Sequence, residues 1–99
     1  MVDKTKMNYQ EYLLTCLIEE CSEVQKAATK ALRFGLNVGH PEKHTTNAED
    51  IAIEFYELKT IFDILTDNSF LIYKAATEKN KKENFDKYVE ISKKLGTLS

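Results

Sequence analysis

The sequence predicts an all-α protein, organised as an antiparallel helical bundle. Apolar residues recur at the three- and four-residue intervals of a helix over long stretches, and no segment alternates apolar and polar residues as a half-buried strand does. No Asn-Gly or Asp-Gly hairpin turn occurs. The 99 residues fit a single domain spanning positions 1–99. Because the helices are apolar on more than one side and the chain is short, we expect oligomerisation to complete the bundle.

The first helix is predicted to begin after Asn8 and to run to about Phe34. The side chain of Asn8 can cap this helix, and Glu11, three residues later, completes a capping-box pattern. Gly35 then provides a helix stop. Residues 36–46 follow as a connecting loop, since they contain a glycine, the only proline and both histidines.

A second helix is predicted to start at Asn47, with this residue as its N-cap, and to continue to Leu65. The sequence TDNS then interrupts the apolar pattern. A third helix is expected over about 69–80 and a fourth over about 83–95. Gly96 is the expected stop of the last helix.

Two pairs of glutamates occupy helix positions that usually carry apolar side chains: Glu20 with Glu23, and Glu54 with Glu57. Each pair has i, i+3 spacing and lies on one helix face. Glu20 falls inside the apolar arc of its helix and Glu23 at the border of that arc, whereas Glu19 points into the polar sector. The first arc comprises Leu13, Cys16, Leu17, Cys21, Val24, Ala27, Ala28, Ala31 and Phe34. The second comprises Ile51, Phe55, Leu58, Ile61, Phe62 and Leu65, widened by Ile53 and Ile64.

An ionised carboxylate in an apolar setting is costly unless it is paired, protonated or bound to a metal. Antiparallel packing of the first two helices would bring all four carboxylates together. Oxygen-rich sites of this kind suit Mg²⁺ or Mn²⁺, and Mg²⁺ usually completes its shell with water and substrate phosphates. We therefore expect a divalent-cation site that acts on a phosphate compound.

Three other interpretations compete with this site. A di-iron carboxylate bundle would need Glu-x-x-His motifs, and the sequence has none. His40 and His44 fall in the predicted loop, where we expect them to be solvated. Glutamates are also good helix formers that usually lie on wet surfaces. Finally, the chain could be a non-catalytic helical interaction module, with apolar oligomer seams and glutamates paired to lysines of a neighbouring subunit.

Composition narrows the range of partners and compartments. The formal net charge of −2 argues against a nucleic-acid-binding surface. No run approaches the length of a membrane span, and the start of the chain lacks the apolar stretch of a signal peptide, so we expect a cytoplasmic protein without membrane partners. Cys16 and Cys21 are five residues apart, a poor spacing for a metal or redox site, and are expected to be reduced core residues.

Three segments carry a family resemblance: EECSE at 19–23, KALRFG at 30–35 and NAEDIAIEFYEL at 47–58. Together they resemble the MazG-like all-α nucleoside triphosphate pyrophosphohydrolases of small bacterial and phage type, whose signature is EExxE followed by ExxD. The ending KYVEISKKLGTL is similar to the tail of such proteins. This chain has Glu57 where the family usually has aspartate, and Ile91 lies near a position where related tails often carry tyrosine.

The resemblance implies Mg²⁺-dependent hydrolysis of a (deoxy)nucleoside triphosphate to a nucleoside monophosphate and pyrophosphate, with Mn²⁺ as a possible substitute. It assigns the metal and the catalysis to Glu20, Glu23, Glu54 and Glu57. Lys30 and Arg33 resemble phosphate-contacting positions, although a helix C-terminus also favours cations for electrostatic reasons. Lys87 is a further candidate for substrate binding, within a lysine-rich stretch that also reads as a solvated face. A homodimer or homotetramer is the expected assembly, and the preferred base and sugar are left open.

Overall fold

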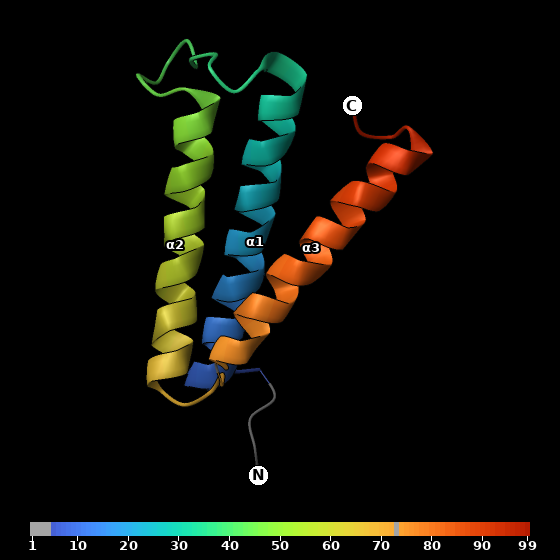
Figure 1. Ribbon diagram of the computed structural model, residues 1–99. Coiled ribbons are helices and arrows are strands. Elements are labelled where there is room, and N and C mark those ends of the chain that lie inside the picture. The colour runs from blue at the N-terminus through green and yellow to red at the C-terminus, as the bar shows by residue number, and fades with distance from the viewer. Residues whose placement is uncertain (1–4, 73) are drawn as a thin grey trace.

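A computed structural model describes residues 5–72 and 74–99 of the chain. Three helices make up most of it: α1 (Tyr9–Phe34), α2 (Asn47–Asp67) and α3 (Ala75–Leu95) (Figure 1). Within these described ranges strand-like pairing is limited to one isolated antiparallel bridge between Gly39 and Thr46. The all-α prediction is confirmed.

The bounds predicted for the first helix are confirmed at both ends of α1. The side chain of Asn8 accepts a hydrogen bond from the Glu11 backbone N–H (2.8 Å), and the Glu11 carboxylate accepts one from the Asn8 N–H (3.1 Å). This reciprocal pair satisfies two backbone donors that the helix itself leaves unpaired. At the other end the chain leaves the helix through Gly35, whose φ of 101° is accessible to glycine and strained for other residues.

The second helix begins where it was predicted, but with a different cap. Thr46 is the N-cap of α2, and its hydroxyl accepts the Glu49 N–H at 3.2 Å. Asn47 is instead the first helical residue, buried, with its Nδ2 donating to the Gly35 carbonyl at 2.9 Å. The prediction of an Asn47 cap was wrong because two good capping residues are adjacent, and a contact with the preceding loop decides between them.

The predicted third and fourth helices are one continuous helix, α3. It starts later than expected, because Ser69 has a φ of 61°, outside the range of a right-handed helix. Residue 73, inside the expected third helix, lies outside the described residues. Residues 80–82, where a break between two helices was expected, are helical. This polar stretch lacks glycine and proline, and its last residue, Lys82, forms an i, i+4 ion pair with Asp86. Gly96, with a φ of 79°, stops this helix as predicted.

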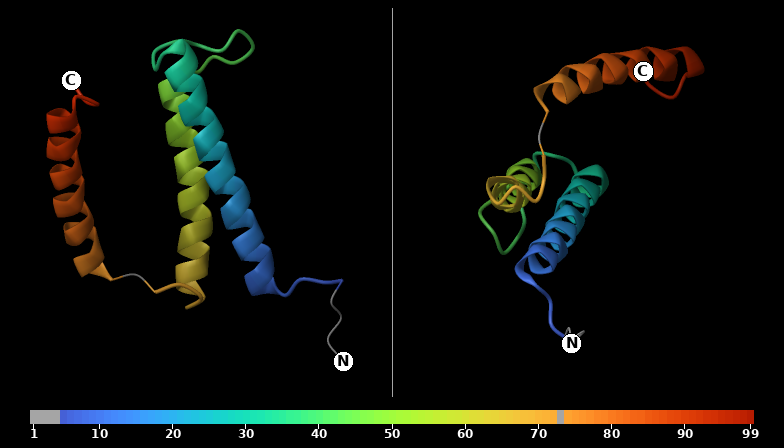
Figure 2. Two further views of the ribbon diagram at one scale, coloured as in Figure 1. Left: turned by 90° about the vertical axis from the view of Figure 1, so that its right-hand side faces the viewer. Right: turned by 90° about the horizontal axis from the view of Figure 1, so that it is seen from below.

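Helices α1 and α2 pack side by side and antiparallel (Figures 1 and 2). Their apolar core is divided between the two ends of the pair. Leu13 and Leu65 are buried where α1 begins and α2 ends, and Ala27 and Ala31 are buried near the opposite end. The small alanine side chains allow the helix backbones to approach there. The middle of the interface is therefore not filled by buried apolar side chains.

Helix α3 stands apart from this pair. It leaves the end of α2, leans away from both other helices and packs against neither within the described residues (Figures 1 and 2). The radius of gyration is 18.0 Å, whereas a compact domain of this length has about 13 Å. Large apolar side chains on α3 are exposed, among them Phe85, Tyr88 and Leu95. In a single chain the bundle is therefore incomplete, because α3 does not pack on the other two helices.

The open arrangement also corrects the prediction made for the cysteines. Both are free thiols, but Cys16 is only half-buried and Cys21 is exposed, so Cys21 is not a core residue. Its position on the apolar arc was inferred correctly, but α2 covers only part of that arc.

No helix of the described residues is long and apolar enough to cross a membrane. The prediction that the start of the chain is not a signal peptide concerns a segment that includes residues 1–4, which lie outside the described residues.

Candidate metal centre between α1 and α2

Three glutamates meet in the middle of the helix pair, between its two apolar ends. Glu20 comes from α1, and Glu54 and Glu57 come from α2, one helical turn apart. One carboxylate oxygen from each lies within 4.8 Å of the other two. The structure thus brings together three of the four carboxylates that the sequence singles out.

Glu20 is the most constrained of the three. Its side chain is half-buried, and its Oε2 atom is buried with no hydrogen-bond partner. Burial raises the pKa of this carboxyl, and the negative charges of Glu57 and Glu23 raise it further. A buried carboxylate oxygen without a partner is costly, so Glu20 requires either a proton or a cation.

Glu54 lies in a similar environment on the facing helix. It is half-buried, and burial followed by the charge of Glu57 raises its pKa. Glu57, in contrast, is exposed. Negative charges crowd together in this group, and a bound cation would offset their repulsion.

Glu23, the fourth predicted ligand, is not part of this group of three. It is exposed and forms an ion pair with Lys26, with 3.4 Å between Oε1 and Nζ. It nevertheless lies close enough for its charge to raise the pKa of both Glu20 and Glu54. An exposed ion pair of this kind is weak. Glu23 can therefore turn from Lys26 toward the group of three at little cost.

A small hollow of about 100 Å³ adjoins the group of three, because Glu54 belongs to that group and also lines the hollow, as Glu23 does. Its other lining residues are Lys26, Ala27, Lys30, Lys43, Asn47 and Asp50. We call it the cationic hollow, since three lysines surround it. The carboxylates of Glu23, Asp50 and Glu54 line the same hollow, and such a mixture of carboxylates and ammonium groups suits an anion that carries its own divalent cation.

The predicted basic residues divide between this hollow and other places. Lys30 lines the cationic hollow, whereas Arg33 lines a shallow hollow of about 370 Å³ on α1 together with Lys26 and Lys30. Lys87 lies on α3, which packs on neither α1 nor α2, so it is remote from the glutamates in the described chain. Lys30 is therefore the predicted cation best placed beside them.

Sequence reasoning missed Lys43 and Asp50. Lys43 belongs to the α1–α2 loop, and no periodicity shows where a loop side chain lies. Asp50 lies in the first turn of α2, lines the cationic hollow and accepts a hydrogen bond from the Thr45 hydroxyl at 2.6 Å. Its i, i+4 spacing from Glu54 is a signal that could have found it.

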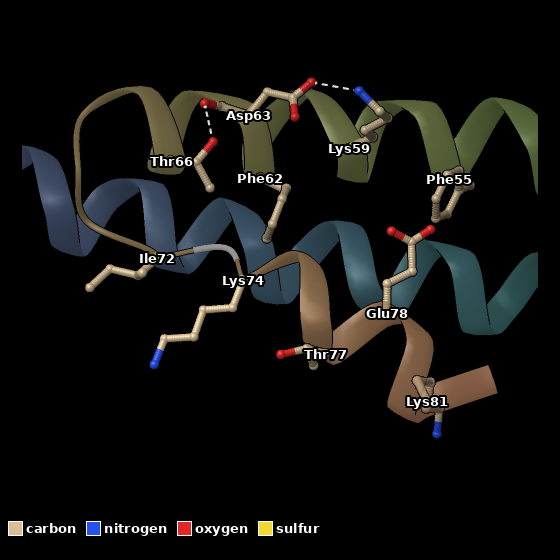
Figure 3. Close-up of a pocket in the computed structure, with 10 residues that line it drawn as sticks. All are labelled: Phe55, Lys59, Phe62, Asp63, Thr66, Ile72, Lys74, Thr77, Glu78 and Lys81. Carbon is tan, nitrogen blue, oxygen red and sulfur yellow. Dashed lines mark hydrogen bonds and ion pairs between the residues drawn. The ribbon is translucent and has the colours of Figure 1, made fainter. Parts of the chain in front are cut away.

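A much wider hollow of about 910 Å³ lies between α2 and the start of α3 (Figure 3). Phe55 and Phe62 point into it from α2, beside an ion pair between Lys59 and Asp63 (2.8 Å). None of the three clustered glutamates lines it. It reflects the gap left by the unpacked α3 and is not the candidate site.

The donor set fits a hard divalent cation. Two oxygens bound to one Mg²⁺ at about 2.1 Å lie about 3 to 4.2 Å apart, so the observed separations within 4.8 Å require only a small closing movement. A bound cation would give the unpartnered Oε2 of Glu20 the partner that it lacks.

No family model, curated protein or solved structure matches this chain.

Proposed function

We propose that this protein is a Mg²⁺-dependent pyrophosphohydrolase that converts (deoxy)nucleoside triphosphates to nucleoside monophosphates and pyrophosphate. The observation that carries the proposal is that Glu20, whose Oε2 is buried and unpartnered, clusters with Glu54 and Glu57 in the middle of a helix pair. The resemblance of the EECSE and NAEDIAIEFYEL segments to MazG-like enzymes supplies the reaction type.

In this proposal Glu20, Glu54 and Glu57 hold the cation, and Glu23 becomes a ligand when it leaves Lys26. A Mg²⁺ ion held by these residues, or Mn²⁺ in its place, would offset phosphate charge and lower the pKa of a bound water. A water molecule attacks the α phosphorus and loses a proton to the solvent, the bond from that phosphorus to the bridging oxygen breaks, and pyrophosphate leaves. Helix packing excludes bulk water from one oxygen of Glu20.

The cationic hollow supports phosphate binding beside those carboxylates. Lys30 on α1 and Lys43 on the loop line it from different segments of the chain, so they can contact an anion from two directions. Arg33, one turn beyond Lys30, extends the positive charge along α1. Arginine suits two-point contacts to phosphate oxygens, whereas lysine acts as a point charge.

The decisive experiment measures pyrophosphate release from a panel of ribo- and deoxyribonucleoside triphosphates with Mg²⁺ or Mn²⁺. We expect release with at least one of them, and none after chelation. The same cations are expected to raise the melting temperature, because they bind the folded carboxylate group and not the unfolded chain. Absence of both effects would contradict the proposal.

A non-catalytic helical interaction module is the second candidate, favoured by the exposed apolar side chains of α3. It predicts the same helices and the same oligomer. It predicts no rise in melting temperature with Mg²⁺, however, because glutamates paired with lysines of another subunit have no need of a cation. Melting curves with Mg²⁺ and with an equal ionic strength of Na⁺ separate the two candidates.

We also propose that a second subunit completes the bundle, as a homodimer or homotetramer. The large radius of gyration, the unpacked α3 and the exposed Phe85 and Tyr88 support this assembly. Light scattering across a range of protein concentrations is expected to give twice or four times the mass of the 11.4 kDa chain. A monomer at every concentration would contradict it.

A further inference from the structure

Another hollow, of about 430 Å³, lies next to the cationic hollow at the C-terminal end of α1. It is lined by Lys30, Phe34, Val38, Gly39, His40, Pro41 and Asn47, and we call it the loop pocket. We propose that the loop pocket binds the nucleobase of the nucleotide whose phosphates occupy the cationic hollow. This inference rests on the proposed function and adds to it a base-binding site.

The loop pocket is a built feature of the fold. The chain turns sharply at Gly35, and a Cβ placed there would come within 3.4 Å of the Val38 side chain. The start of α2 then holds the turn: the Asn47 N–H donates to the Val38 carbonyl (2.9 Å), and the Asn47 side chain donates to the Gly35 carbonyl (2.9 Å). A buried side chain thus fixes one wall of the pocket before any ligand arrives.

The opposite wall is also ordered by hydrogen bonds. The His40 N–H donates to the Thr45 carbonyl at 3.2 Å, next to the bridge between Gly39 and Thr46. The Nδ1 atom of His40 accepts the Glu42 N–H at 3.0 Å. In the neutral ring this places the proton on Nε2, so the imidazole offers a single defined donor.

Phe34 supplies the aromatic surface of the pocket. It is the last residue of α1 and is 60% exposed, although it lies on the apolar arc of that helix. Within the described chain it therefore packs only partly, and its side chain lines the pocket. Aromatic rings with this exposure stack readily on nucleobases, and neighbouring Val38 and Pro41 provide the apolar contacts that a base edge tolerates.

The order of the sites matches the order of groups in a nucleotide. Glu54 joins the clustered glutamates to the cationic hollow, and Lys30 and Asn47 join that hollow to the loop pocket. A ligand lying along this track meets carboxylates that would hold a cation, then lysines, then an apolar pocket with an aromatic ring. A nucleotide matches this order, because its phosphates carry a cation and negative charge at one end and its base is a flat, mostly apolar ring at the other.

The test compares Phe34→Ala with Leu32→Ala, a matched control on the same helix whose side chain is 89% exposed and lines no part of the pocket. Two probes are used with Mg²⁺: a nucleoside triphosphate, whose binding is followed by calorimetry and whose turnover is followed by pyrophosphate release, and inorganic tripolyphosphate, which has no base, as a competitor. We expect Phe34→Ala to raise KM for the nucleotide about tenfold, because stacking is lost. We expect kcat and the inhibition constant of tripolyphosphate to be unchanged, and Leu32→Ala to match the wild type.

The outcomes separate this inference from the proposed function. Pyrophosphate release with an unaltered KM in Phe34→Ala overturns the base site and leaves the enzyme intact. Nucleotide binding that Phe34→Ala weakens, without any pyrophosphate release by the wild type, supports the base site and overturns the hydrolase. Equal weakening of nucleotide and tripolyphosphate binding also overturns the base site, because the change then acts on the phosphate end. If the wild type binds no nucleotide, both proposals fall.

Discussion

Replacing Glu20 by glutamine is expected to lower pyrophosphate release by more than about 100-fold, because a ligand that offsets transition-state charge contributes several kcal/mol. Glutamine keeps the size of the side chain but removes the negative charge. The Oε2 atom of Glu20 is buried without a hydrogen-bond partner, and Glu20 clusters with Glu54 and Glu57. The measurement is the rate of pyrophosphate release with saturating Mg²⁺.

Glu19→Gln is the matched control for this variant. Glu19 is the neighbouring residue in the same EECSE segment, but it is exposed and lies outside the clustered glutamates. Its replacement is expected to change the rate only a few-fold. Equal losses in both variants would show that the effect comes from the charge of the segment as a whole, and unchanged activity in Glu20→Gln would remove Glu20 from the metal centre.

The same substitution has a second expected effect, on stability without metal. The pKa of Glu20 is raised above its ordinary value of 4.5 in the folded chain. Between 4.5 and the raised pKa the folded state binds more protons than the unfolded state, so ionisation on raising the pH destabilises the fold. Glu20→Gln removes this contribution. The variant should therefore be more stable than the wild type at neutral pH, and the difference should shrink as the pH falls toward 4.5.

Chemical denaturation in the presence of a chelator at several pH values measures this difference. Comparison with the wild type at each pH cancels the titration of the exposed ion pairs, such as Lys59–Asp63. A variant less stable than the wild type at neutral pH would mean that the Glu20 carboxylate is stabilised by a partner in the metal-free protein. The repulsion inferred among the glutamates would then be wrong.

Local signals in the sequence account for the parts of the fold that were predicted well. Both ends of α1 follow from Asn8, Glu11 and Gly35, whose effects act over one turn of helix. The arc that includes Glu20 but not Glu19 also follows from helical geometry alone, and the structure agrees, because Glu20 is half-buried and Glu19 exposed. Periodicity is a reliable guide when one neighbouring helix defines the buried side.

The parts that were missed depend on contacts between distant segments. Periodicity places Cys21 on an apolar arc but cannot say that α2 covers only a part of it. Asn47 looks like a cap until the Gly35 carbonyl is near enough to accept its side chain. Lys43 approaches the cationic hollow only because the loop folds back toward α1. Each of these depends on tertiary geometry, which no local pattern encodes.

The continuity of α3 was missed for a different reason. Its middle carries lysines, glutamates and asparagine with no apolar stripe, so the amphipathic signal disappears for about two turns. Helix propensity is nevertheless retained, since lysine and glutamate are good helix formers. A helix that buries little within its own chain offers no apolar stripe there to detect, and α3 packs on neither neighbouring helix.

Replacing Leu65 by alanine is expected to lower the free energy of unfolding by about 3 kcal/mol, as deletion of a buried leucine side chain does. Leu65 is 0% exposed and lies at one end of the helix pair, where Leu13 is also buried. Native domains have a total stability of only about 5 to 15 kcal/mol, and few apolar side chains are buried in the described chain. The loss is measured by urea denaturation at fixed protein concentration, with the exposed Leu32→Ala as the control, expected to change stability by less than about 0.5 kcal/mol.

Mg²⁺ should restore much of the stability lost in Leu65→Ala, because the cation links α1 to α2 through Glu20, Glu54 and Glu57 independently of the apolar ends. At a concentration about 100 times its Kd, a ligand that binds only the folded state adds about 2.7 kcal/mol. This nearly offsets the loss of the leucine side chain. The double variant Leu65→Ala with Glu20→Gln should gain little from Mg²⁺. Equal rescue of the single and double variants would place the bound cation elsewhere, and the middle of the helix pair would then need another explanation for its buried carboxylate.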